Sequence, residues 1–409
     1  MKLKFSFNLT NVLKIIAFCL FAASIASIPI FSFNPKLYLL TWAIVGLMLV
    51  DMGLYMFLKR TFNIDVVVLS LVAFSFSALI SSALNGFHGF NFTPILLPIA
   101  TSIIYLFSKS SSSSKTMLMS AFSGICVFLL AFVIFYRNNI LHLDFHERLG
   151  GIFGDENDIA ILLGFGFIYS FYLGLNSKKV IYIIVFSLLS LLFAFCGLLT
   201  GSKIYLLILF FGSTTTIFLR FGKRKWWISC LIIFGIITIG IILLTLPMFS
   251  ALKNRLLMFF NTFFGASDSS MRADYSSIFR LYMFQDGIEM FFRKPLFGFG
   301  IWGFATYGGL NNGWSHNHFS EGLCNFGLVG FTLFHIPFLS SLYHFFKTDN
   351  KKEVGGAFTL LVFFLVSMIS LSFFTQKIYA FVSAPVFSCF IHKTIFSFSL
   401  FRKKERSLS

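Results

Sequence analysis

The stretch VIYIIVFSLLSLLFAFCGLL, residues 180–199, contains no charged side chain. An apolar run of about 20 residues is long enough to cross a bilayer as a single helix. Comparable runs recur throughout the 409 residues, which are 57% hydrophobic and 11% charged, whereas soluble domains carry about 25% charged residues. The sequence therefore predicts an all-α polytopic membrane protein, with residues 1–409 forming one membrane-embedded unit.

About twelve membrane spans are expected from the apolar runs. Their predicted bounds are 11–33, 37–57, 64–85, 94–107, 116–136, 158–175, 180–199, 204–219, 228–250, 317–346, 354–374 and 378–400. The run at 94–107 is short, so a re-entrant segment is the alternative there. Two connections are long, at about 137–157 and 251–316, and the second is the largest part of the chain expected outside the bilayer.

Basic residues gather in alternate, short connections. They are Lys2 and Lys4, Lys59 and Arg60, Lys109 and Lys115, Lys178 and Lys179, the cluster 220–225, Lys347 with Lys351 and Lys352, and the cluster 402–406. Cytoplasmic loops carry an excess of Lys and Arg, so both termini are predicted in the cytoplasm and both long connections in the periplasm. A signal peptide ending in the small residues 22–27 is the alternative interpretation of the first span.

Composition also excludes several function classes. The net charge of +17 follows from the membrane topology, so no nucleic acid partner is expected. The six cysteines all lie in apolar segments and none forms a CxxC pair, which predicts neither a disulfide framework nor a metal site. The chain contains no GxxxxGK[ST] phosphate loop, so no use of ATP is predicted.

Two candidate sites lie at predicted outer turns. Arg148 precedes Gly150 and Gly151 and the acidic run 155–158. It is either an ion-pair partner of those acids or an anion-binding guanidinium, and the acids themselves suit a helix N-terminus. Lys203 stands in the short connection after residue 199. It is either an interfacial lysine or a second cation for a phosphate-bearing substrate.

A third candidate, Arg280, lies in an amphipathic stretch of the long connection. Wound as a helix, this stretch places Leu281, Phe284, Ile288 and Phe291 on one face, and Arg280 borders that face. An unpaired guanidinium against a membrane domain is costly, which favours a functional role. Pro295 then ends the predicted helix, and Gly298 and Gly300 favour a loop.

The fourth candidate is His316, where the long connection enters the tenth span. A neutral imidazole at a wet membrane surface suits proton abstraction near neutral pH. His318 is two positions away, and side chains at that spacing do not converge on a helix, so a metal site is not expected. An interfacial histidine without a catalytic role is the alternative.

These residues together resemble the O-antigen ligases and the related O-antigen polymerases. The resemblance rests on His316-Asn317 followed by nine residues, Gly327, two residues and Gly330, and on Arg280 with Pro295-Leu-Phe-Gly298-Phe-Gly300. Arg148-Leu-Gly-Gly-Ile-Phe is similar to the family's Arg-x-x-Gly-x-Phe stretch, and Thr200-Gly-Ser-Lys203 to a Thr-x-Ser-Arg element. Lys203 stands where Arg is usual, Glu156 where Pro is usual, and Asn325 where many members have Glu.

The resemblance implies a glycosyltransferase of the GT-C type in the bacterial inner membrane, without metal or other cofactor. Its substrate would be a glycan on undecaprenyl diphosphate, and a chain-length regulator protein would be a further partner. Arg148, Arg280 and His316 would be the catalytic residues. Arg148, Lys203, Arg280 and Asn317 would bind the diphosphate and glycan.

Four hypotheses about the function remain open, namely a polymerase, a ligase, a flippase and a structural subunit. The polymerase reading is favoured over the ligase reading on the Gly154–Asp158 stretch, the Phe content and the compact basic loops. A flippase for lipid-linked sugars would use Asp51, within the second span, as an ion site, but no repeated halves are evident. A purely structural membrane subunit predicts that Arg280 and His316 tolerate replacement by alanine.

Overall fold

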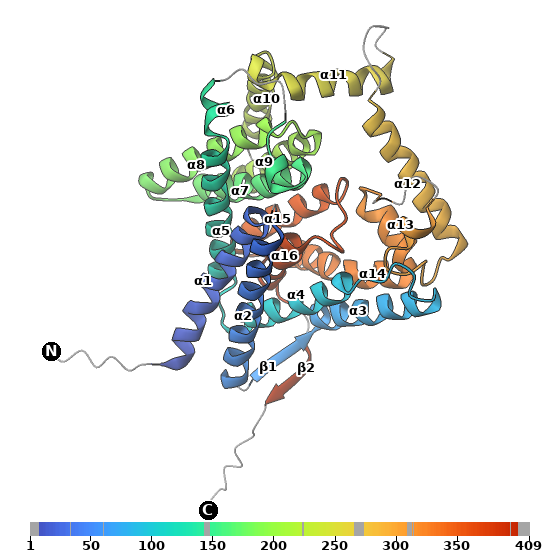
Figure 1. The fold of residues 1–409 in the computed structure, drawn as a ribbon. Coiled ribbons are helices and arrows are strands. Elements are labelled where there is room, and N and C mark those ends of the chain that lie inside the picture. The colour runs from blue at the N-terminus through green and yellow to red at the C-terminus, as the bar shows by residue number, and fades with distance from the viewer. Residues whose placement is uncertain are drawn as a thin grey trace, which may run out of the picture.

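The computed structural model describes residues 8–32, 34–59, 61–142, 148–222, 225–265, 274–308, 313, 315–392 and 394–399. Lys2, Lys4, Arg60 and the basic cluster 402–406, used above to predict sidedness, lie outside these residues. The described chain is a bundle of helices with one small sheet (Figure 1). It is an all-α polytopic membrane protein, as predicted.

A helix overlaps each of the twelve predicted spans. These helices are α1 (Leu9–Ile30), α2 (Pro35–Lys59), α3 (Val66–Leu84), α4 (Thr93–Ser110), α5 (Ser114–Phe135), α7 (Glu156–Asn176), α8 (Val180–Leu199), α9 (Lys203–Phe221), α10 (Trp226–Leu243), α14 (His318–Lys347), α15 (Lys351–Ser367) and α16 (Lys377–Ser388). Within the described ranges, ten of them are long and apolar enough to cross a membrane, and α15 and α16 are shorter. The doubtful span at 94–107 is a full helix, α4.

The last predicted span, 378–400, is wrong in its second half. Helix α16 ends at Ser388, and residues 394–399 form a strand, β2 (Thr394–Ser399). This strand pairs antiparallel with β1 (Thr61–Asp65), and in the backbone register Phe62 pairs with Phe398 and Ile64 with Phe396. Apolar and polar residues largely alternate in residues 61–65 and 394–399, which is the pattern of a strand. The prediction of a helix at 378–400 rested on the total apolar content of that run.

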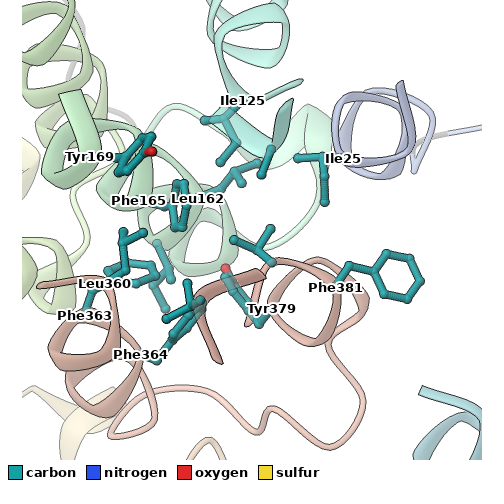
Figure 2. Close-up of a cluster of buried hydrophobic side chains, with 14 of the residues drawn as sticks. Ile25, Ile125, Leu162, Phe165, Tyr169, Leu360, Phe363, Phe364, Tyr379 and Phe381 are labelled. Carbon is teal, nitrogen blue, oxygen red and sulfur yellow. The ribbon is translucent and has the colours of Figure 1, made fainter. Parts of the chain in front are cut away.

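Helix α7 forms the centre of the bundle. Almost every residue from Asn157 to Ser170 is buried, as expected for a helix that is apolar on all sides. Figure 2 shows Leu162 and Phe165 of α7 facing Phe363 of α15 and Tyr379 of α16. The first turn of α7 is therefore held in a fixed position by a packed core.

The long connection between α10 and α14 contains three helices. They are α11 (Ser250–Phe264), α12 (Tyr275–Arg293) and α13 (Gly303–Tyr307). In Figure 1, α11 crosses the top of the view and α12 descends on its right, at the end of the molecule opposite β1 and β2. The short helix α6 (Arg137–His142) forms the start of the other long connection.

Helix α14 is broken at Gly327, which has φ +61° and ψ −169°. Ring centroids of His318 and His335 are 5.1 Å apart, although 17 residues of continuous helix would separate them by about 25 Å. Phe319 likewise lies against Phe331. The predicted tenth span, 317–346, is therefore two helices that fold back on each other, and Gly327 makes a reversal and not just a close packing surface.

The loop at 295–300 fills this break. The backbone N–H groups of Phe299 and Gly300 donate to the carbonyls of Cys324 and Asn325, at 2.9 and 2.8 Å. The N–H of Leu328, just after the break, donates to the carbonyl of Pro295 at 2.8 Å. The backbone groups that a broken helix leaves unpaired are thus satisfied by the loop that follows α12.

Replacing Gly327 with alanine is expected to destabilise the protein strongly. A Cβ there would lie 2.4 Å from the backbone carbon and oxygen of Leu296. The φ/ψ region itself is essentially restricted to glycine and costs other residues about 1–3 kcal/mol. We expect a lower yield of folded protein and a lower melting temperature in detergent.

Gly46→Ala is the matched control for this prediction. Gly46 lies inside helix α2, and no atom lies within 4 Å of the position its Cβ would take. Alanine is favoured over glycine in a helix interior by about 1 kcal/mol. Equal melting temperatures for the Gly327→Ala and Gly46→Ala variants would contradict the role given to Gly327.

Candidate functional site

The turn between α8 and α9 brings two of the predicted sites together. The Nε of Arg148 donates to the carbonyl of Thr200 at 2.9 Å, and the N–H of Leu149 donates to the carbonyl of Leu199 at 3.1 Å. Gly201 adopts φ +61°, and a Cβ there would lie 3.1 Å from Cγ of Arg148. Arg148 therefore lies directly on the turn that precedes Lys203.

Arg148 also contacts the start of α7. It forms a salt bridge of 3.2 Å with Glu156, and its Nη2 lies 3.4 Å from Oδ1 of Asn157. The Oγ of Ser202 donates to the same Asn157 oxygen at 2.8 Å. The ion pair expected from the sequence is thus present, and it leaves the Arg148 side chain 25% exposed. Its role in catalysis and diphosphate binding stays a prediction.

A second guanidinium, Arg255 of α11, reaches the same turn and was not among the predicted residues. Its Nη1 donates to the carbonyl of Gly201 at 2.7 Å. Burial lowers the pKa of Arg255, and the nearby charges of Arg148 and Arg280 lower it further. One signal in the sequence was available, because Lys253 and Arg255 are basic residues in a connection that the positive-inside rule assigns to the outer side.

Arg280 of α12 completes the group of guanidiniums. It is half-buried, and its Nη1 lies 3.5 Å from Oγ of Ser370. Within the described ranges no carboxylate lies at salt-bridge distance from it. Burial lowers its pKa and so does Arg148, whereas Asp155 acts in the opposite direction.

Arg148, Arg255 and Arg280 are called the arginine cluster below. Arginine stays protonated in proteins, so a lowered pKa means that the like charges repel and that burial penalises them. An anion placed among the three would relieve both costs. Guanidinium groups bind phosphate oxygens by paired hydrogen bonds, so the arrangement suits a phosphate-bearing ligand.

Lys203 is engaged with α12. Its ammonium pairs with the carboxylate of Asp274 and donates to Oγ of Ser277 at 2.6 Å. Burial opposes ionisation of Asp274, but hydrogen bonds from Lys203, Ser277 and Ser276 outweigh it and hold its pKa at about 2. Asp274 caps α12, the helix that carries Arg280. Lys203 thus fixes the position of Arg280, and direct binding of diphosphate by Lys203 stays a prediction.

His316 lies in a tight loop before α14 and has φ +52°, a region that few residues other than glycine adopt. On one side, the buried Ser315 bonds to Glu321, with Oγ to Oε2 at 3.0 Å. On the other, Oδ1 of Asn317 accepts from the N–H of Phe319 at 3.0 Å and caps the helix. Non-glycine residues in such conformations cluster at functional sites.

Asn317 therefore holds the loop that presents His316. Its Nδ2 also donates to the carbonyl of Ile369 at 3.2 Å. Its predicted role in substrate binding is not required by these contacts and stays a prediction. The neighbouring His318 is fully buried, and its Nδ1 accepts from the N–H of Phe373 at 3.0 Å.

His316 lines a pocket of about 280 Å³ together with Asp155, Asp158 and the segment 371–376. Burial lowers the pKa of His316, and Arg280 lowers it further, whereas Asp155 raises it. The imidazole is therefore neutral at pH 7 and able to accept a proton. The effect of Arg280 also means that the arginine cluster and the histidine pocket belong to one electrostatic site.

Residues 188–335 match the family model described as O-antigen ligase. This segment is therefore similar to the O-antigen ligase family. It includes Lys203, Arg255, Arg280 and His316, whereas Arg148 lies before it and is brought to it by the fold. No curated protein matches the chain. The match supports the family predicted from the motifs, and an activity of the O-antigen ligase and polymerase type.

Proposed function

We propose that the protein is an inner-membrane O-antigen polymerase that joins undecaprenyl-diphosphate-linked oligosaccharide repeats at the periplasmic face. The observation that carries this proposal is the arginine cluster beside the pocket of a neutral His316. A diphosphate leaving group and a hydroxyl acceptor require one site with clustered cations and a base. No metal is needed in this mechanism.

In the proposed reaction a hydroxyl oxygen of the acceptor sugar attacks the anomeric carbon of the donor. The bond between that carbon and the diphosphate oxygen breaks, and the carrier lipid leaves as the diphosphate anion. His316 takes the proton of the attacking hydroxyl. The arginine cluster stabilises negative charge that grows on the leaving oxygen, which lowers the transition state more than the ground state. Direct displacement inverts the anomeric configuration.

The surfaces of α11 and α12 support a lipid-linked substrate. Phe260 and Phe264 of α11 are 52% and 73% exposed, and Tyr275 and Tyr282 of α12 are 74% and 55% exposed. Tyrosine is enriched at membrane–water interfaces, and phenylalanine is favourable in contact with lipid chains. Arg255 and Arg280 lie on the same two helices, so a prenyl chain resting there would bring its diphosphate to the arginine cluster.

The acceptor distinguishes the two members of this reaction class. A polymerase transfers the growing chain to another lipid-linked repeat, whereas a ligase transfers the finished chain to lipid A–core. The matched family model is described as O-antigen ligase, so ligation is the second candidate. The sequence features that favour polymerase are the Gly154–Asp158 stretch and the compact basic loops.

The test is the lipopolysaccharide ladder of a strain in which the coding sequence is deleted. We expect lipopolysaccharide consisting of core plus one repeat unit. If the strain instead makes bare core and retains long chains on undecaprenyl diphosphate, the protein is a ligase and not a polymerase. Repeat units stranded on the cytoplasmic leaflet would indicate a flippase, and an unchanged ladder would contradict all three assignments.

A further inference from the structure

A second depression, of about 630 Å³, lies apart from the His316 pocket and between two segments distant in sequence. One is the loop between α3 and α4, which contributes His88, Phe90 and Asn91. The other is the start of α13, which contributes Trp302 and Thr306. None of these residues belongs to the motifs on which the family resemblance rests.

The backbone around Trp302 is held in an uncommon conformation. Trp302 has φ +64° and directly precedes α13. The N–H of Ile301 donates to Oγ of Ser82 at 3.0 Å, and the N–H of Phe304 donates to Oδ1 of Asn325 at 2.7 Å. Conformations of this kind persist where surrounding contacts fix them, and they cluster at ligand sites. The backbone that carries the Trp302 indole is thus held in place on both sides.

A close approach of the two segments shapes the depression. Gly89 has φ +66°, and a Cβ at this position would lie 2.8 Å from Oγ1 of Thr306 and 3.4 Å from Cβ of Trp302. Glycine therefore allows the α3–α4 loop to lie directly against α13. Any larger residue at position 89 would push the two walls apart.

The lining combines aromatic faces with hydrogen-bonding groups. Phe90 and Trp302 supply rings, and His88, Asn91 and Thr306 supply polar atoms. The Oδ1 of Asn91 accepts from the N–H of Thr93 at 2.8 Å, which orients its amide beside the start of α4. A pyranose ring presents apolar C–H faces and a rim of hydroxyls. Apolar walls with a small number of placed polar groups can bind such a ligand and fix its orientation. A hydrocarbon chain would leave those polar groups unpaired.

The depression is linked to His316 through the first half of α14. Asn325 accepts the hydrogen bond that fixes the start of α13, and Asn317 caps the same helical segment beside His316. We infer that the depression binds a sugar unit of the acceptor glycan remote from the hydroxyl that reacts. This inference rests on the proposed function and adds a subsite to it.

The test measures binding and transfer separately. The binding probe is the repeat oligosaccharide of the host strain, freed from its carrier by mild acid and added to the full-length protein in nanodiscs. Saturation-transfer NMR is expected to show binding that weakens at least about tenfold in Trp302→Ala, a change that corresponds to about 1.4 kcal/mol. His88→Ala, at an exposed position, tests the same subsite without a change in the strained backbone, and is expected to weaken binding in the same direction.

In transfer assays, the KM for the acceptor should rise in both variants while the KM for the lipid-linked donor stays the same. Trp227→Ala is the matched control, because Trp227 is 54% exposed on α10 and lies outside the lining of the depression. Unchanged oligosaccharide binding in Trp302→Ala and His88→Ala would overturn the inference. A Trp302→Ala variant that inserts poorly but binds the oligosaccharide normally would also overturn it, because Trp302 would then be an interfacial anchor. Absence of glycan transfer by the wild-type protein would instead overturn the proposed function.

Discussion

Replacing His316 with alanine is expected to reduce glycan transfer by about 10²–10⁴-fold, the usual contribution of a general base. The attacking hydroxyl would then lose its proton acceptor, while the arginine cluster would still bind the diphosphate. The variant should therefore retain donor binding and lose turnover. Transfer by the purified protein in proteoliposomes, with lipid-linked donor and acceptor, measures both quantities.

The pH dependence of transfer identifies the base. His316 must be neutral to accept a proton, and its pKa is lowered from the ordinary value near 6.5 by burial and by Arg280. Activity should thus persist below pH 6.5 and fall as the pH drops through the lowered pKa. His344→Ala, in the last turn of α14, is the control and should leave the profile unchanged. If the transfer rate falls at the same acidic pH in the wild type and in His316→Ala, His316 is excluded as the base.

Replacing Arg280 with alanine is expected to reduce transfer by about 10²–10³-fold, the usual effect of removing one donor that stabilises a developing anion. Arg280 is half-buried, and no carboxylate within the described ranges lies at salt-bridge distance from it, so its guanidinium is available to the leaving group. Arg280→Lys should recover part of the rate, because an ammonium keeps the charge but lacks the planar fork that matches phosphate.

Arg293→Ala is the matched control for this experiment. Arg293 is the same residue type on the same helix, and it is exposed. Both variants are assayed in proteoliposomes with equal amounts of inserted protein. Wild-type turnover in Arg280→Ala, or an equal loss in Arg293→Ala, would contradict the assignment of the diphosphate to the arginine cluster.

Hydropathy was sufficient to predict most of the helices, because a bilayer restricts the chain to long apolar helices. The break in α14 could not be predicted in the same way. A glycine in an apolar helix serves close packing as readily as reversal, and the choice at Gly327 depends on the backbone of Leu296. That contact joins segments on either side of α13, and a pattern along one helix does not reveal it.

The candidate site was predictable by residue type but not by partner. Arg148, Lys203, Arg280 and His316 were chosen because cations and a histidine are unusual in outer connections. Two of these contacts depend on how α11 and α12 return to the bundle. They are the salt bridge between Lys203 and Asp274, and the hydrogen bond from Arg255 to a backbone carbonyl. Backbone acceptors such as Gly201 carry no signature in the sequence.

The pairing of β1 with β2 sets an order on assembly. Residues 61–65 are synthesised early, but the strand that pairs with them ends at residue 399. Until the ribosome has passed that position, β1 has an unpaired edge, and such edges are prone to wrong pairings. The intervening helices are therefore made first, so the sheet forms at a late step of biogenesis, and a ribosome stalled before residue 394 leaves β1 without its partner strand.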